Sequence, residues 1–130
     1  MLVEFRIKNF RSLRDEQLLS LVASPDKSLL DTHALDTGLK AAPHVLKSAV
    51  VYGANASGKS NLIKALQYMR GVVLESATII QPGQTFAVQP FQLDDRSASQ
   101  PSEFEVTFIL DGVRYQYRSE ERRVGKECLR

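Results

Sequence analysis

The sequence predicts a mixed α/β fold, and two patterns carry this prediction. Apolar and polar residues alternate along residues 1–10, 103–110 and 113–117, as they do in half-buried strands. From Lys59 onward the apolar residues recur instead at the three- and four-residue spacing of a helix. The chain has 130 residues, of which 43% are hydrophobic and 25% charged, and this is the composition of a single globular domain.

The N-terminal part predicts two paired strands followed by a loop. Residues 1–10 form the first strand, and residues 17–23 form a second apolar run that we expect to pair with it. The polar residues 11–15 predict the turn between the two strands. Residues 24–47 contain a glycine, two prolines and several Asp, Ser and Thr, which indicates a loop with one short helix at most.

A short buried strand and a long helix are expected next. Residues 49–52 are apolar and end at a glycine, as a buried strand would. The helix follows from Lys59. Its apolar positions at helical spacing are Leu62, Ile63, Leu66, Met69 and Val73.

Three further strands are predicted in the C-terminal half. Residues 86–93 and 103–110 read as strands separated by a polar stretch. The dipeptide Asp111-Gly112 predicts a type I′ turn into a strand at 113–117, because glycine takes the positive φ of this turn at little cost. The side chains expected on one face of 103–110 are Phe104, Val106, Phe108 and Leu110.

Between the predicted buried strand and the helix, residues 53–60 read GANASGKS and match the phosphate-loop pattern G-x-x-x-x-G-K-[ST]. Gly58 allows close wrapping of the backbone around phosphate, and the loop N–H groups with the helix N-terminus form a nest for anions. Lys59 is expected to reach the β- and γ-phosphates of a nucleotide, and Ser60 to offer its hydroxyl to Mg²⁺. The alternative is a glycine-rich turn with an incidental lysine. The predicted binding residues are Gly53, Ala54, Asn55, Ala56, Ser57, Gly58, Lys59 and Ser60.

The position of this loop in the chain and its residues resemble those of a known family. About fifty residues with two strand-like runs precede the loop, which resembles the RecF, SMC and ABC-type ATPase heads. Residues 5–12 (FRIKNFRS) are similar to the start of those heads, and residues 53–61 to their G-x-N-x-x-G-K-S-N loop. With 90–93 (PFQL) and 115–117 (YQY), most of residues 1–117 looks like the RloA-like, OLD-related AAA family of prokaryotic ATPases.

This resemblance implies an α/β P-loop NTPase fold, namely the incomplete N-terminal half of a RecF/SMC/ABC-type head with an antiparallel β layer. Asn55 and Ser57 would shape the loop around the phosphates. Two readings are open for Arg11, a contact with nucleotide or a partner subunit, or a surface arginine in a turn. Asn61 would either contact nucleotide or only begin the helix. Ala56 stands where the wider group usually has glycine, which argues against a transporter ATPase and leaves phosphate binding intact.

The implied function is ATP binding and, in a full-length parent, ATP hydrolysis coupled to conformational change of a partner. The resemblance also implies an ATP-dependent homodimer and, as the partner, a nuclease or nucleic acid in a defence setting. Two alternatives are open, a non-catalytic nucleotide-binding module and a GTPase or kinase of another P-loop class, although the guanine-reading N-K-x-D is absent.

We expect no catalytic residue within this chain, and therefore little hydrolysis by it alone. Residues 106–111 imitate a Walker B strand, but Asp111 belongs to the predicted turn and no glutamate follows it. Gln92 is interpreted as a strand glutamine rather than a Mg²⁺ sensor. His33 and His44 lack the spacing of metal ligands.

The C-terminal segment needs a separate interpretation. Residues 118–128 read RSEERRVGKEC, which is the translation of a common sequencing adapter in its first frame. The alternative is a natural charged tail. We therefore expect residues 1–117 to be the N-terminal part of an ATPase domain and residues 118–130 to be an artefact. Residues 118–130 also carry the whole net charge of +2 and the single cysteine, so neither feature indicates nucleic-acid binding or redox chemistry.

The sequence predicts a cytoplasmic protein with no membrane partner. No apolar run approaches the roughly 20 residues that span a bilayer. The N-terminus alternates charged and apolar residues and does not resemble a signal peptide.

Overall fold

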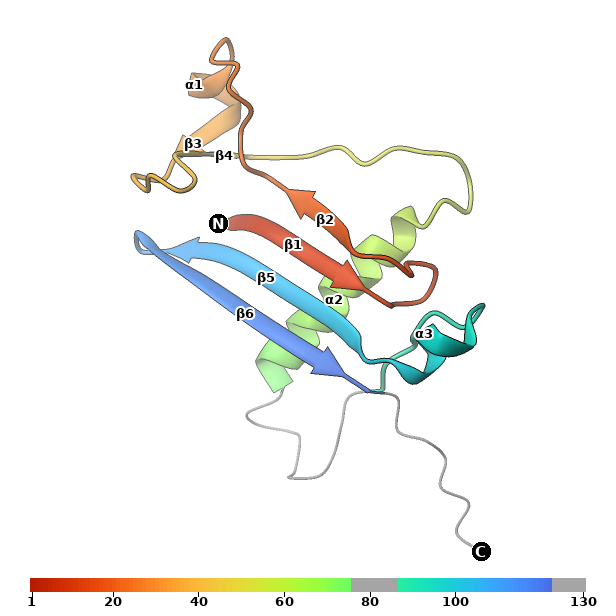
Figure 1. Cartoon of the computed structure of the whole chain (residues 1–130). Coiled ribbons are helices and arrows are strands. Elements are labelled where there is room, and N and C mark those ends of the chain that lie inside the picture. The colour runs from red at the N-terminus through yellow and green to blue at the C-terminus, as the bar shows by residue number, and fades with distance from the viewer. Residues whose placement is uncertain (76–86, 123–130) are drawn as a thin grey trace, which may run out of the picture.

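The computed structural model describes residues 1–75 and 87–122. At its centre is an antiparallel sheet of four strands in the order β2-β1-β5-β6, with helix α2 across one face (Figure 1). The strands are β1 (Leu2–Lys8), β2 (Gln17–Ser20), β5 (Ser102–Leu110) and β6 (Val113–Glu121), and the helix α2 is Lys59–Glu75. The predicted mixed α/β fold with an antiparallel layer is confirmed.

Strand β1 occupies a central place in this sheet. It pairs with β2 as predicted, with Phe5 opposite Leu19 and Ile7 opposite Gln17. On its other side β1 pairs antiparallel with β5, where Phe5 lies opposite Val106. The alternating pattern of residues 1–10 therefore corresponds to a strand whose apolar residues are buried.

Strands β5 and β6 form the predicted hairpin. Asp111 has a φ of 51° and Gly112 a φ of 74°, which are the two positive angles of a type I′ turn. Strand β6 continues to Glu121, and Arg118 lies opposite Glu105 of β5. The first residues of 118–130 thus continue this strand, and the adapter origin of that segment stays a prediction.

The larger core lies between the sheet and α2. Phe5 and Phe104 from the sheet are buried against Ala65 and Met69 of the helix. Phe10, which follows β1, meets Phe104 edge to face with 5.4 Å between ring centroids. This core holds β1, β5 and the helix in one unit.

Only part of the apolar stripe of α2 is buried against the sheet. Met69 is buried, and Leu62 and Leu66 are partly buried against the same core. Ile63 and Val73 are about half exposed, at 54% and 45%. The helix itself is confirmed over the predicted range.

A smaller core covers another part of the sheet. Val3 and Ile109 pack there with Ala42 and Val45. Val45 belongs to a hairpin of β3 (Ala34–Asp36) and β4 (His44–Leu46), which follows helix α1 (Leu30–His33). The interpretation of 24–47 as a loop with one short helix is correct for α1 and wrong for this hairpin, because three-residue strands are too short to show an alternating pattern.

The covered face changes along β5. Phe104 and Val106 belong to the core under α2, whereas Ile109 belongs to the smaller core. Because side chains alternate along a strand, Phe104, Val106 and Phe108 share one face of β5 and Ile109 lies on the other. Leu110 is 56% exposed, so the predicted apolar face of β5 is covered only along its first part.

Two predicted strands are absent from the structure. Residues 49–52 form no strand, and Val50 and Tyr52 are 84% and 89% exposed. Among the described residues no strand lies beside this segment to pair with it. Residues 87–93 also form no strand; Pro90 has no N–H to donate to a ladder. Phe86, the first residue of that predicted strand, lies outside the described residues.

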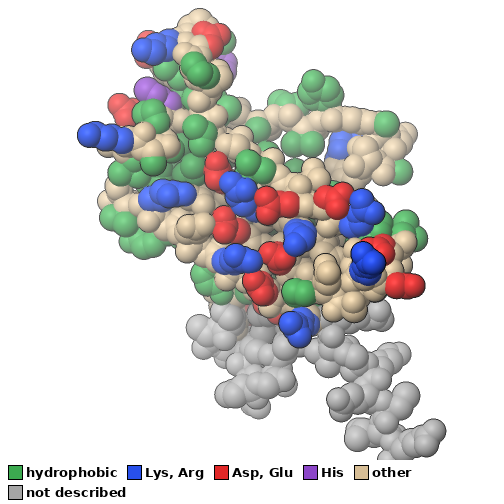
Figure 2. Space-filling model, viewed as in Figure 1, with side chains coloured by type: hydrophobic (Ala, Val, Ile, Leu, Met, Phe, Trp, Pro, Cys, Tyr) green, Lys and Arg blue, Asp and Glu red, His purple; other side chains and the backbone are tan. Residues whose placement is uncertain are grey.

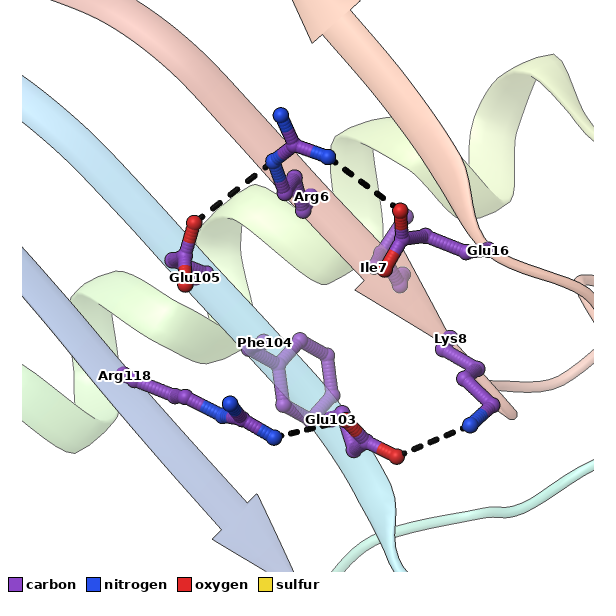
Figure 3. A pocket seen from close by; sticks show the side chains of 8 residues that line it. All are labelled: Arg6, Ile7, Lys8, Glu16, Glu103, Phe104, Glu105 and Arg118. Atoms are coloured by element: carbon purple, nitrogen blue, oxygen red, sulfur yellow. Dashed lines mark hydrogen bonds and ion pairs between the residues drawn. The ribbon is translucent and has the colours of Figure 1, made fainter.

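The face of the sheet away from α2 is charged. Figure 2 shows basic and acidic side chains intermixed on it. Figure 3 shows Arg6 between Glu16 and Glu105. The Arg6 guanidinium lies 3.2 Å from the Glu16 carboxylate and 3.5 Å from the Glu105 carboxylate. Lys8 and Arg118 both lie 3.0 Å from the carboxylate of Glu103. Exposed pairs of this kind add little stability, and they make this face a solvated surface.

The remaining described helix is α3 (Asp95–Ser99), which precedes β5. The carboxylate of Asp94 accepts from the N–H groups of Arg96 and Ser97 and caps it. The hydrogen bond from the Ser97 hydroxyl holds the pKa of Asp94 below its ordinary value. Within residues 1–75 and 87–122, no helix is both long and apolar enough to cross a membrane.

Candidate nucleotide-binding site

The phosphate loop, residues 53–60, leads directly into the N-terminus of α2. A turn at its centre brings the Ser57 N–H to 3.3 Å from the Ala54 carbonyl oxygen. Ala56 within this turn has a φ of 61°, the left-handed region that favours glycine. The backbone thus has a glycine-like conformation at the position where the resembled heads usually carry glycine.

The second glycine of the phosphate-loop pattern, Gly58, stands at a position that needs glycine for two reasons. Its φ is 95°, which side-chain-bearing residues rarely adopt. A β-carbon there would also lie 3.2 Å from the Ser12 Oγ and 3.4 Å from the Leu13 Cδ2. The loop therefore packs closely on the turn between β1 and β2.

Lys59 folds back across the loop. Its Nζ donates to the carbonyl oxygens of Gly53 at 2.7 Å and Ala54 at 2.6 Å, and lies 3.5 Å from the Ser57 Oγ. The ammonium is therefore centred over the concave side of the loop. Phosphate oxygens accept stronger, charge-assisted hydrogen bonds than neutral carbonyls do, so a bound phosphate would compete well for this lysine.

A cavity of about 440 Å³ opens beside the loop. The loop contributes Gly53 and residues 57–59 to its wall, and strand β2 contributes residues 17–19. Leu13 and Leu62 add apolar surface. A volume in this range fits a small-molecule ligand. The combination of an apolar wall and a phosphate loop suits a ligand with an apolar ring at one end and phosphates at the other.

Asn61 and Ser12 bring the two sequence motifs into contact. The Asn61 Nδ2 donates to the Ser12 Oγ at 2.7 Å, although the residues are 49 positions apart in the chain. The Asn61 N–H also donates to the Gly58 carbonyl oxygen at 2.9 Å, at the start of α2. The sequence predicts nucleotide contact or helix initiation for Asn61, and it carries no pairwise signal for this contact with Ser12.

Arg11 lies on another side of the same turn. Its φ is 52°, and its guanidinium lies over the Phe10 ring, 5.5 Å from the centroid. It lines a separate cavity of about 440 Å³ with Lys64, Gln67 and Gln89, among others. Arg11 is not among the residues that line the phosphate-loop cavity.

The other predicted loop residues are exposed. Ala54, Asn55 and Ser60 stand at the surface of the loop and the first turn of α2. Among the described residues no cluster of three or more His, Cys, Asp or Glu could hold a metal ion. Mg²⁺ commonly takes one or two protein ligands and fills its remaining positions with phosphate oxygens and water, so the exposed Ser60 hydroxyl would suit it.

Four further polar residues with candidate roles in the sequence lie outside the phosphate-loop cavity: His33, His44, Gln92 and Asp111. Asp111 lies in the β5–β6 turn, as predicted. Gln92 is exposed and outside any strand, so its interpretation as a strand glutamine is wrong. His33 ends α1, with its Nδ1 2.6 Å from the Thr32 hydroxyl, and His44 begins β4.

An antiparallel sheet, a glycine-rich loop and the helix that follows it fit part of an α/β domain of the P-loop class. Residues 48–124 match the family model described as "AAA domain, putative AbiEii toxin, Type IV TA system". The match covers more than half of the chain, so the chain belongs to this family of AAA domains, which are of the P-loop ATPase type. No curated protein matches the chain.

Proposed function

We propose that this chain binds ATP together with Mg²⁺ at the phosphate loop, residues 53–60. The observation that carries the proposal is the cavity of about 440 Å³, bounded on one side by the phosphate loop with Lys59 centred over it. Membership of an AAA family supports the same conclusion. The loop N–H groups and the N-terminus of α2 would hold the phosphates, since both present donors and positive potential.

Within this site each residue has a separate task. Lys59 would exchange the carbonyl oxygens of Gly53 and Ala54 for phosphate oxygens. Asn55 and Ser57 would shape the loop around the phosphates, and Ser60 would give its hydroxyl to Mg²⁺. The metal, when bound, would supply positive charge that neutralises the phosphates.

We further propose that this chain alone hydrolyses ATP poorly. Among the described residues no carboxylate lines the phosphate-loop cavity, and the aspartate that imitates Walker B lies in a turn. Hydrolysis needs an oriented water beyond a cradle for the phosphates. For this chain, the same observation favours the second candidate function, a non-catalytic nucleotide-binding module.

A finer assignment rests on the motifs. We place the chain with the RloA-like, OLD-related ATPases of the RecF/SMC/ABC type, because residues 5–12 and 53–61 match their motifs and lie against one another. By this resemblance the full-length parent would dimerise around ATP, with Arg11 at the nucleotide or the partner subunit. It would drive a nuclease or act on nucleic acid in the cytoplasm.

The test is a titration of the full chain with Mg·ATP, compared with two lysine variants. Lys59→Ala is expected to weaken binding at least tenfold, because it removes the charge centred over the loop. Lys64→Ala is the matched control, since Lys64 is an exposed lysine on the same helix. Equal affinity in Lys59→Ala and the wild-type chain would contradict the assignment. A clear preference for GTP in competition would favour the GTPase alternative instead.

A further inference from the structure

The contact between Asn61 and Ser12 joins the phosphate loop to the sheet. Asn61 lies in the first turn of α2, directly after the loop, and Ser12 lies in the turn between β1 and β2. Their side chains are 2.7 Å apart, with the Asn61 amide donating to the serine hydroxyl. A single side-chain hydrogen bond therefore connects the loop end of the helix to a distant part of the chain.

The loop itself packs on the same serine. The ideal β-carbon position of Gly58 lies 3.2 Å from the Ser12 Oγ, so the loop backbone and this hydroxyl are in close contact. Leu13 lies almost as close, at 3.4 Å. Ser12 thus contacts the loop at Gly58 and also accepts the hydrogen bond from Asn61.

The turn that carries Ser12 is held firmly on its other side. Asn9, which begins this turn, is 2% exposed and has a φ of 56°. Its Oδ1 accepts from the Phe91 N–H at 3.0 Å, and the Ser102 hydroxyl donates to its carbonyl oxygen. The carbonyl oxygens that accept from its Nδ2 belong to Ser97 at 2.8 Å, Gln100 at 3.0 Å and Pro101 at 3.1 Å.

The residues after Asn9 complete the turn. Phe10 and Leu13 exchange two backbone hydrogen bonds, at 2.8 Å and 2.9 Å. The Arg11 N–H donates to the Gln89 carbonyl oxygen at 2.8 Å. Ser12 is therefore presented to the loop from a backbone that is fixed at both ends.

We propose that Ser12 and Asn61 are positioning residues of the nucleotide site. They hold the phosphate loop and the first turn of α2 in the conformation that receives phosphates, and they do so through one another rather than by touching the nucleotide. This inference rests on the proposed function, since it describes how the same site keeps its shape.

The experiment is a double-mutant cycle in the full chain, with Mg·ATP as the probe. Ser12→Ala and Asn61→Ala are each expected to lower ATP affinity about fivefold, the effect of losing one ordinary hydrogen bond. The double variant is expected to bind as each single variant does, because both changes remove the same interaction. Ser12→Thr keeps the hydroxyl at an exposed position and is expected to bind within about twofold of the wild-type chain.

Other outcomes would overturn the inference. Additive losses in the double variant would mean that the two side chains act independently, as direct nucleotide contacts would. Unchanged affinity with a lowered unfolding midpoint would mean that the bond only stabilises the fold. If the wild-type chain binds ATP and Lys59→Ala does not, either outcome rejects the positioning role and leaves the proposed function standing. A wild-type chain that does not bind Mg·ATP would reject both.

Discussion

The sheet with α2 and the segment that leads into the phosphate loop differ in how their apolar side chains are covered. Phe5 and Phe104 are at most 1% exposed beneath the helix. Val50 and Tyr52, just before the loop, are 84% and 89% exposed. The first region is stabilised by its own packing, whereas the described residues cover the side chains of Val50 and Tyr52 very little.

In this molecule, stability and ligand binding depend on different regions. The closed region, the sheet with α2, contains most of the buried apolar surface, which is the main source of folding free energy. The open region, residues 49–60, contains the N–H groups of the phosphate loop and Lys59. The Nζ of Lys59 donates to carbonyl oxygens of the loop itself. Changes in the closed region should therefore alter unfolding, and changes in the loop should alter ligand binding.

Truncation of one aromatic residue in each region is expected to give the largest difference in stability. Phe104→Ala is expected to lower the free energy of unfolding by about 3–5 kcal/mol, because it leaves a cavity between the sheet and α2. Tyr52→Ala is expected to change it by less than about 0.5 kcal/mol, because the side chain is exposed. Urea unfolding followed by circular dichroism measures both. A similar cost at the two positions would show that residues 49–52 are packed.

The buried amide of Asn9 provides the next largest effect. Asn9→Ala is expected to cost about 3 kcal/mol, because it leaves several buried backbone groups without their hydrogen bonds. Asn55→Ala in the exposed loop serves as control, with a change below about 0.5 kcal/mol. The same urea titrations compare the two. A cost for Asn9→Ala no greater than the control would mean that water replaces those bonds readily.

Gly58 lies at the boundary between the two regions. Gly58→Ala is expected to cost about 2 kcal/mol, since its φ of 95° and the nearby Ser12 both disfavour a β-carbon. It should also weaken Mg·ATP binding, because the loop must shift. Thermal unfolding and nucleotide titration of one preparation measure the two effects. Wild-type behaviour in both would contradict the close packing of the loop on the turn.

A smaller effect in the opposite direction is expected at Ala56. Its φ of 61° is strained for alanine, so Ala56→Gly should stabilise the chain by up to about 1 kcal/mol. Ala56→Val is the matched opposite change and should destabilise it. Differential scanning calorimetry distinguishes the two directions. Destabilisation by glycine would mean that the loop does not hold this conformation in solution.

The smallest effect concerns alkaline pH. Burial, with a lesser contribution from Glu121, raises the pKa of Tyr68, whose ring stacks on Phe104 at 4.9 Å. The folded chain then keeps the neutral phenol above pH of about 10, where the unfolded chain loses its proton, so stability falls as pH rises further. Tyr68→Phe should remove this part of the decline. Identical pH profiles of the two proteins between pH 9 and 11 would contradict the shift.

The elements that could be predicted from the sequence have a clear residue pattern and, for the strands, a pairing partner among the described residues. Strands β1, β2, β5 and β6 show clear alternation and pair with one another, and α2 is long enough to show a helical period. The type I′ turn at Asp111-Gly112 follows from local backbone preference alone. The phosphate loop was visible because its chemistry requires particular residues at fixed spacing.

The rest depended on information that local patterns do not carry. An apolar run such as 49–52 becomes a strand only where a neighbouring strand supplies hydrogen bonds. The segment 87–93 instead bonds to the β1–β2 turn, through Gln89 and Phe91. The Asn61–Ser12 contact and the place of Arg11 over the Phe10 ring are long-range or conformational outcomes that neither spacing nor composition encodes.

The exposed phosphate loop, residues 53–60, is the proposed nucleotide site. Amide hydrogen exchange of the full chain, measured with and without saturating Mg·ATP, reports on these loop N–H groups themselves. Slower exchange is expected at the N–H groups of residues 54–61 and little change in β1 and β5, with no slowing in Lys59→Ala. Loop exchange that is the same with and without Mg·ATP in the wild-type chain would contradict the account.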